Sequence, residues 1–206
     1  PSGSSEYHLL IASALVRFSS YLHKFEFDAQ DIAKRLTGKK AKCQKKDLFL
    51  MKELLLEAAI EEHLKQIRQT PTDLEVHASL ANVYISLSKL YQDEKKPKKT
   101  FDKKFQRAAF RAIEELKILQ DFAPKDPWVH SQLAKAYRIL DKKEEELHQY
   151  EILLTLNPAD SEIVFRLGVL YFENGKNANG LRMVDRISSL DEKRRDDLLS
   201  YYGKDH

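Results

Sequence analysis

The stretch LNPADSEIVFRLGVLY, residues 156–171, decides the fold because it joins a turn signal to a helical pattern. Its Asn-Pro pair interrupts one helix and opens a turn, and Leu167, Gly168 and Tyr171 then follow at spacings that place them on one helical face. The same arrangement stands 34 positions earlier, with a proline in the turn and then Leu133, Ala134 and Tyr137. Self-similarity at a fixed period of this length predicts a fold built from repeats.

A third copy of the pattern lies further upstream at a larger shift. Leu80, Ala81 and Tyr84 precede their counterparts by 53 positions, which is 19 more than one repeat. The additional residues fall between Tyr84 and Ala112, inside one repeat and not between two. We therefore expect a hairpin with two lengthened helices, whose lysine-rich tip at residues 93–100 is exposed and mobile.

Each repeat is interpreted as a pair of packed helices. Leucine, a small residue and tyrosine at i, i+1 and i+4 form a stripe on a first helix, and the small residue lets a second helix approach closely. The proline near the end of a repeat cannot continue a helix but can open the loop to the next one. Only six Gly and six Pro occur in 206 residues, which is little turn chemistry for a protein of many strands. The sequence predicts an all-α fold.

This pattern resembles the tetratricopeptide repeat family, whose 34-residue unit carries Leu-Gly or Leu-Ala, Tyr, Ala, an aromatic residue and Pro at fixed offsets. Residues 127–160 and 161–194 match it best. Glu146 and Gly180 stand where the family usually has Ala, and Glu192 replaces the closing Pro. The resemblance implies a right-handed α-solenoid of tetratricopeptide-type helical hairpins.

The repeats divide the chain into predicted segments. Amino-terminal helices are expected in residues 1–45, where residues 1–5 are interpreted as a linker remnant and Asp28 can cap a short helix that reaches Leu36. Asp191 can cap a last, solubilising helix. The remaining segments are a long helix that is a degenerate repeat (46–73), a repeat with the 19-residue insertion (74–126), two ordinary repeats (127–160 and 161–194) and a capping helix with a tail (195–206).

Catalytic and metal-binding patterns are missing from the sequence. No two of the seven histidines stand at i, i+3 or i, i+4, the spacing that suits two metal ligands on one helix. The zinc-protease, serine-hydrolase and phosphate-loop motifs are also absent. We expect a protein without catalytic activity, cofactor or metal ion.

Cysteine content and hydropathy bear on the compartment. A single cysteine, Cys43, excludes an intramolecular disulfide and favours a reducing compartment. The apolar run from Leu9 to Val16 is far shorter than the roughly 20 residues of a membrane span. The sequence predicts a protein of the cytoplasm or of the cytoplasmic face of a membrane, and an anchor or signal upstream of residue 1 stays open.

Two lysine-rich stretches, residues 39–46 and 95–104, raise the question of nucleic acid. The formal net charge is only +3, because acidic residues are interspersed through most of the chain. Since binding to phosphates needs many cations in contact at once, nucleic acid is not favoured as a partner. Solvated loops and helix ends are the simpler interpretation, with an acidic protein or an anionic membrane surface as alternatives.

Stacked hairpins place their first helices along a concave groove, where a partner would bind. Trp128 and Phe172 are the expected aromatic anchors, and the polar residues are expected to orient backbone or carboxylate groups of the partner. Packing between repeats is the alternative for the aromatic residues, and a solvated helix face is the alternative for the polar ones. By the resemblance, the groove residues are Asn82, Trp128, Gln132, Lys135, Arg138, Arg166 and Phe172.

Some members of the family hold the carboxylate end of a chaperone with a clamp of Lys, Asn, Asn, Lys and Arg. Here Asn82 and Arg166 match the clamp and Gln132 stands for the second Asn, but Ala78 and Glu162 replace the two lysines. The resemblance implies that the partner is an acidic or carboxylate-bearing peptide, although the clamp in this chain is incomplete. Replacing Arg166 by Glu is expected to abolish partner capture and to leave the stability within about 0.5 kcal/mol.

Three functions remain open from the sequence. The first is a non-enzymatic module that binds a peptide or a protein segment in its groove. The second is a secretion or assembly chaperone that holds an unfolded partner. The third is a structural scaffold in which the amphipathic amino-terminal helices pack on another copy of the chain.

Overall fold

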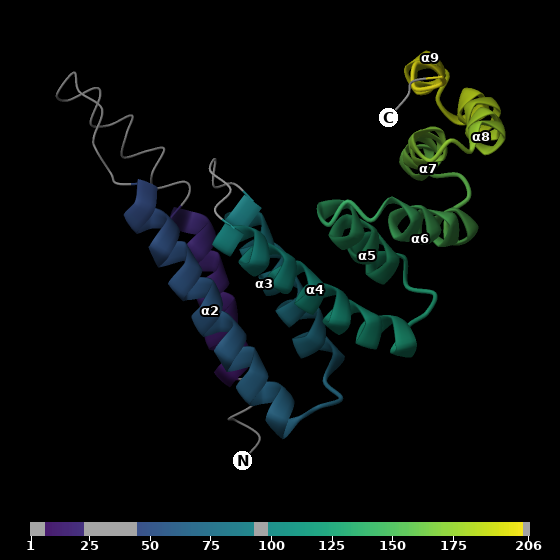
Figure 1. Cartoon of the computed structure of the whole chain (residues 1–206). Helices are drawn as coiled ribbons and strands as arrows, with labels where there is room; N and C mark the ends of the chain where they lie inside the picture. Colours follow the sequence, from purple (N-terminus) through teal and green to yellow (C-terminus); the bar gives the residue numbers. More distant parts are fainter. Residues whose placement is uncertain (1–6, 23–44, 93–98, 204–206) are drawn as a thin grey trace. The chain divides into compact units, whose positions relative to one another are not determined.

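The structure, a computed structural model, describes residues 7–22, 45–92 and 99–203 (Figure 1). Within these ranges the secondary structure is helical and contains no strand. The predicted all-α fold is confirmed. The short helix expected between Asp28 and Leu36 and most of the lysine-rich tip lie outside the described residues.

The chain forms two compact units, Pro1–Glu115 and Leu116–His206. The boundary falls inside helix α4, Lys99–Phe122, and not in a loop between repeats. The repeat with the insertion therefore contributes residues to both units.

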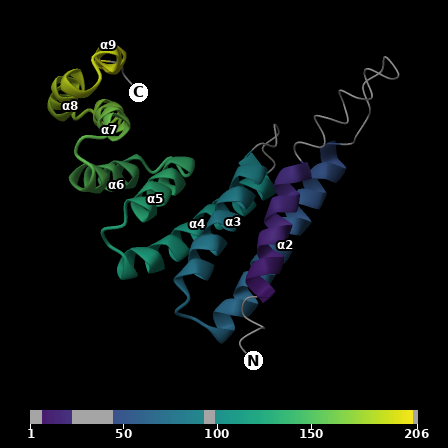
Figure 2. The ribbon, with the colours of Figure 1, turned by 180° about the vertical axis from the view of Figure 1, so that it is seen from behind.

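The first unit contains a helix at residues 7–22, then α2 (Lys45–Gln69), α3 (Leu74–Gln92) and most of α4. These long helices lie side by side, as the views from the front and from behind both show (Figures 1 and 2). Helices α3 and α4 have 19 and 24 residues, whereas the first two helices of the second unit have 13 and 14. The insertion has therefore lengthened both helices of its hairpin.

The core of the first unit contains a cluster of alanine, branched aliphatic and tyrosine side chains from every one of these helices. Ala12 from residues 7–22 is fully buried in one cluster with side chains from α2, α3 and α4. The other members of this cluster are Leu56, Ala59, Val83, Leu87, Tyr91 and Ala108.

The second unit continues with five helices that pack in sequence order: α5 (Pro127–Ile139), α6 (Lys143–Leu156), α7 (Ser161–Glu173), α8 (Asn177–Leu190) and α9 (Lys193–Leu199). Helix α5 pairs with α6 and α7 pairs with α8, while α9 contacts both α7 and α8. The predicted packing residues Leu133, Ala134, Leu167 and Gly168 are all buried. The leucine and small-residue stripe thus faces helices, as the repeat pattern indicates.

The first helices begin at the same capping device. The Asp126 carboxylate accepts a hydrogen bond of 2.9 Å from the Trp128 backbone N–H, and 34 residues later Asp160 accepts one of 2.9 Å from Glu162. These caps satisfy amide groups that a helix leaves without intrahelical partners. The aspartate in front of α5 and of α7 therefore serves as the N-cap of that helix.

The hairpin turns are also equivalent. Gly175 between α7 and α8 has φ 69°, and Asp141 between α5 and α6, 34 positions earlier, has φ 54°. After the turns, Lys176 N–H donates to the Tyr171 carbonyl at 2.8 Å, and Lys142 N–H to the Tyr137 carbonyl at 3.0 Å. One left-handed residue closes each hairpin, and only one of the two sites uses glycine.

The last helix departs from the prediction at its start. Glu192, not Asp191, is the N-cap of α9, and it makes no side-chain capping bond. The Asp191 Oδ2 instead lies 3.5 Å from the Nε of Arg194. Asp191 ends α8, which leaves its carboxylate free to pair with the first turn of α9.

Candidate protein-interaction surface

The seven predicted groove residues belong to both units. Asn82 is exposed on α3 of the first unit. The other six lie on the first helices of the second unit, α5 and α7.

Phe172 of α7 is not available to a partner in this structure. Its side chain is only 4% exposed, and its ring centroid lies 5.8 Å from that of Tyr202. Helix α8 approaches the same ring so closely that a Cβ on Gly180 would clash with it. Phe172 therefore packs in the core, which is the alternative interpretation, and we do not propose it as an anchor.

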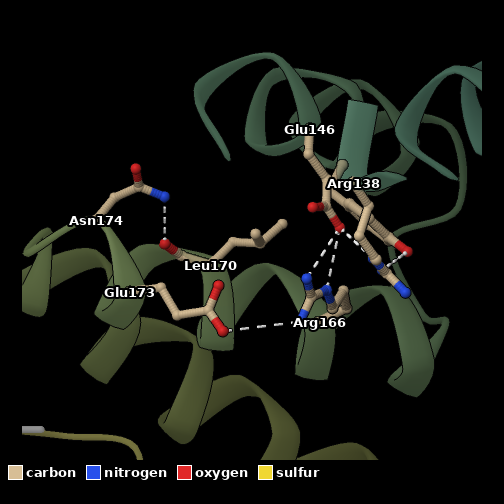
Figure 3. Close-up of polar contacts among 7 residues, drawn as sticks. Arg138, Glu146, Arg166, Leu170, Glu173 and Asn174 are labelled. Carbon is tan, nitrogen blue, oxygen red and sulfur yellow. Dashed lines mark hydrogen bonds and ion pairs between the residues drawn. The ribbon is translucent and has the colours of Figure 1, made fainter. Parts of the chain in front are cut away.

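Arg138 and Arg166 converge on an internal carboxylate (Figure 3). Glu146 of α6 is 2% exposed, and its Oε1 accepts hydrogen bonds of 2.7 Å from Arg138 Nε and of 3.1 and 3.0 Å from Arg166 Nε and Nη2. Arg138 also donates to the Tyr150 hydroxyl at 3.0 Å, and Arg166 lies 4.0 Å from Glu173. The two arginines are thus bridged by one buried anion.

This cluster has an electrostatic consequence for Arg138. Burial is the largest single effect and would lower the pKa of its guanidinium, but the hydrogen bond to Glu146, the charge of Glu146 and the contact with Tyr150 together raise the pKa. Because a buried carboxylate without its cation is costly, both arginines also stabilise the fold. In place of the small change in stability expected from the sequence, we therefore predict that reversing Arg166 destabilises the fold.

The other predicted residues of α5 stay open to solvent. Trp128 is 40% exposed, Gln132 is half-buried and Lys135 is exposed. They recur at i, i+4 and i+7, so they form one stripe that continues toward Arg138. Among the residues that the structure describes, the Lys135 ammonium has no ion pair. We call Trp128, Gln132, Lys135 and the neighbouring Arg138 the α5 face.

His77 and His130, at equivalent positions of two repeats, have a structural role that their sequence spacing as possible metal ligands did not indicate. The Nε2 of His77 lies 3.0 Å from the Pro71 carbonyl, and the Nε2 of His130 lies 2.9 Å from the Pro124 carbonyl. Each ring also contacts the second helix of its hairpin, His77 through Glu115 at 2.6 Å. The signal was present in the sequence, because His77 and His130 are separated by the same 53 positions as the repeats.

Neither a metal site nor a membrane-spanning helix occurs in the described part of the chain. Within residues 7–22, 45–92 and 99–203, no three His, Cys, Asp or Glu side chains are grouped to hold a metal ion. In the same ranges, no helix combines the length and the apolar character that crossing a bilayer requires.

No protein-family model matches the sequence, and no curated protein is similar enough to count as a relative. Among solved structures, a crystal structure of MamA is similar with a TM-score of 0.50 and 16% identity, covering 78% of this chain and 88% of that one. MamA AMB-1 gives a TM-score of 0.50 with 15% identity over 90% and 92% of the two chains. The thermophilic TPR protein TTC0263 of Thermus thermophilus gives 0.48 with 17% identity over 92% and 96%.

At these identities the likeness concerns the fold alone. The chain has an all-helical fold of hairpins of the tetratricopeptide type, so the resemblance stated from the sequence is confirmed for the fold.

Proposed function

We propose that the protein is an interaction module without catalytic activity, and that its α5 face binds an acidic, extended segment of another protein. The observation that carries the proposal is the stripe of Trp128, Gln132 and Lys135 on a helix that is otherwise well packed; Trp128 and Lys135 are exposed and Gln132 is half-buried. An exposed tryptophan beside polar groups is a combination typical of binding hot spots.

The charge of the α5 face favours an anionic partner. Lys135, Arg138 and Arg166 supply three cations, and Glu146 and Glu173 supply two carboxylates. The Arg138 guanidinium keeps N–H donors beyond those that hold Glu146 and Tyr150, and its side chain is half-exposed. A partner carboxylate would thus add to the cluster instead of displacing Glu146, and Lys135, which has no ion pair among the described residues, would be a further cation for it.

The proposal is tested with immobilised peptides that carry acidic residues and one free carboxylate end, with scrambled and lysine-substituted peptides as references. We expect Trp128→Ala and Lys135→Glu each to weaken binding of the acidic peptides by about tenfold or more. Arg182→Glu is the matched control, because Arg182 is an exposed cation on α8 without an ion pair among the described residues. Equal binding by all of these proteins would refute the proposed face.

Self-association is the second candidate, favoured by one observation on the first unit. Large apolar side chains are exposed on residues 7–22 and on α2, among them Leu10 at 71% and Leu54 at 57%. Terminal helices of repeat proteins normally present a polar outer face, so a second copy is the occupant we would test. Light scattering over a range of concentrations decides it, since a constant monomer mass with a folded chain excludes this candidate.

A further inference from the structure

A cleft of about 530 Å³ lies in the first unit, and none of its lining residues belongs to the α5 face. It is lined by residues of α2, α3 and α4. Leu87 and Tyr91 of α3 are buried, so α3 forms its floor, and the mostly exposed lining residues of α2 and α4 form its walls. The apolar lining includes Ile60 and Leu64 from α2 and Leu87 from α3. The volume falls within the range of ligand-binding pockets, and the cleft is open along one side.

The segment that contains the 19-residue insertion lines much of this cleft. Leu87, Tyr91, Lys104 and Arg107 all line it and all lie between Tyr84 and Ala112, where the additional residues fall. The segment with the insertion therefore does more than lengthen a hairpin, because its residues also line the cleft between α2 and α4.

One wall of the cleft is basic. Lys104, Arg107 and Arg111 recur at i, i+3 and i+7 of α4, so they stand on one stripe. Lys104 Nζ is held by the Glu53 carboxylate at 2.6 Å, and Arg111 pairs with Glu114 at 2.8 Å in an exposed contact. Arg107 has no ion pair among the described residues, and its side chain is exposed.

The acidic residues of the cleft are placed differently. Glu115 at one end is taken by His77, whose Nδ1 lies 2.6 Å from its Oε2. Glu57 stands on the opposite wall, α2. A ligand that is acidic along the edge facing α4 and neutral or basic along the edge facing α2 would match both walls.

Tyr84 adds a polar group to the floor. Its ring is half-buried, and burial raises the pKa of its hydroxyl. The equivalent Tyr171 donates to Glu151 at 2.9 Å, whereas the Tyr84 hydroxyl makes no hydrogen bond within the described residues. It is positioned to bond a polar group at the edge of an apolar ligand.

The shape selects a helix as the ligand. The lining residues of α4 run from Lys104 to Glu115, about 16 Å along a helix axis, which equals roughly three helical turns. An extended peptide would leave backbone N–H and C=O groups unpaired over the apolar floor, whereas a helix satisfies its own. We propose that this cleft binds an amphipathic helix of a partner protein that packs apolar side chains on the floor and acidic ones along the α4 wall.

The probe is a synthetic, fluorescently labelled helix of about four turns with a leucine seam and glutamates along one edge. Two reference peptides carry the same composition in scrambled order and lysine in place of glutamate. Binding to the full chain is followed by fluorescence anisotropy. We expect the acidic helix to bind the parent at least about tenfold more tightly than either reference.

Arg107→Glu reverses the cation of the α4 wall that has no ion pair within the described ranges, and it is expected to weaken binding of the acidic helix by about tenfold or more. Arg68→Glu is the matched control, because Arg68 is an exposed cation of the same unit that does not line the cleft. Helical circular dichroism checks that each variant is folded. Equal affinity of the parent and Arg107→Glu, or no preference of the parent for the acidic helix, would overturn the proposal.

The two surfaces are separated by crossed variants. Lys135→Glu should leave the labelled helix bound as in the parent, and Arg107→Glu should leave binding of the acidic peptides to the α5 face unchanged. A loss of helix binding in Lys135→Glu would show that the probe binds the α5 face and would also overturn the cleft proposal.

Discussion

Glu146 and Gly180 occupy the same position in successive repeats, and each lies against the side chain of the residue eight positions before it. Glu146 faces Arg138, and Gly180 faces Phe172, at the same 34-residue shift. A Cβ at Gly180 would clash with the Phe172 ring, while the buried Glu146 needs cations beside it. Glu146 and Gly180 replace the alanine usual at this position because the first helix places Arg138 against one and Phe172 against the other.

Arg166→Glu tests the role of the Glu146 cluster in stability. We expect it to reduce the free energy of unfolding by about 2–4 kcal/mol, because it places a second carboxylate against a buried one. Urea unfolding measures the loss. Lys135→Glu should stay within about 0.5 kcal/mol of the parent, as is usual for an exposed residue outside a network. A similar small effect of both substitutions would mean that Glu146 does not depend on Arg166.

His63 of α2 gives a pH dependence with a definite sign. The ring is fully buried, its Nε2 lies 3.1 Å from the Ser79 hydroxyl, and burial lowers its pKa from 6.5 to about 4. The neutral ring is therefore favoured by the fold. Its contribution is complete above pH 6.5 and is lost as the pH falls toward 4, by at most about 1.4 kcal/mol per pH unit.

The measurement is the difference in pH dependence between the parent and His63→Gln, which keeps a hydrogen-bonding group near Ser79. Other titrating groups are common to both proteins and largely cancel. The parent should lose stability more steeply than His63→Gln on acidification from pH 6.5. Parallel curves would show that His63 is not titrated by unfolding.

At the scale of elements, α9 packs on α7 at Gly168, where the absence of a side chain leaves room for Leu198 of α9. A Cβ on Gly168 of α7 would lie 2.7 and 2.9 Å from the two terminal carbons of Leu198, and 3.1 Å from the Met183 Cβ. The equivalent residue in the preceding repeat is Ala134. The additional space at Gly168 is used by the buried Leu198 of the last helix.

Gly168→Ala is expected to destabilise the protein by about 1–3 kcal/mol, the usual cost of overpacking. Leu198→Ala removes the opposing side chain, so the double variant should cost less than the sum of the two single variants. Denaturant unfolding of the three variants gives the coupling. Additive losses would contradict a direct contact between these residues.

Periodicity was sufficient for the helices but not for their side-chain partners. The spacing of Leu133, Ala134 and Tyr137 predicted the helical pairs and the buried stripe because apolar periodicity and helix packing are local consequences of sequence. The Glu146 cluster was missed because it joins three helices, and no pattern within one helix records such a contact. Phe172 was misplaced because the sequence did not show that Tyr202 would cover its ring.

The start of the last helix shows the same limit. A carboxylate in front of a helical pattern predicts a cap, and Asp126 and Asp160 fit that rule. Asp191 satisfies the same local pattern but pairs with Arg194, because α8 and α9 follow each other without a longer loop. Local rules placed the helix correctly to within a few residues and its cap incorrectly.

At the scale of the whole molecule, each compact unit carries one proposed binding surface. The α5 face in the second unit would take an extended acidic segment, and the cleft in the first unit would take an acidic helix. The two surfaces use different cations, Lys135 on the α5 face and Arg107 in the cleft. We therefore expect a substitution at one of them to leave binding at the other surface unchanged. A partner that uses both would lose affinity in either variant.

The most direct test of the central claim uses the single tryptophan of the chain, Trp128, as a reporter at the proposed site. An acidic peptide that binds the α5 face must cover the partly exposed indole, so its fluorescence should shift to shorter wavelengths as the peptide is added. The shift should saturate at the affinity found with the immobilised peptide and should disappear in Lys135→Glu. Binding that leaves the emission of Trp128 unchanged would contradict the proposed site, because the peptide would then be held elsewhere.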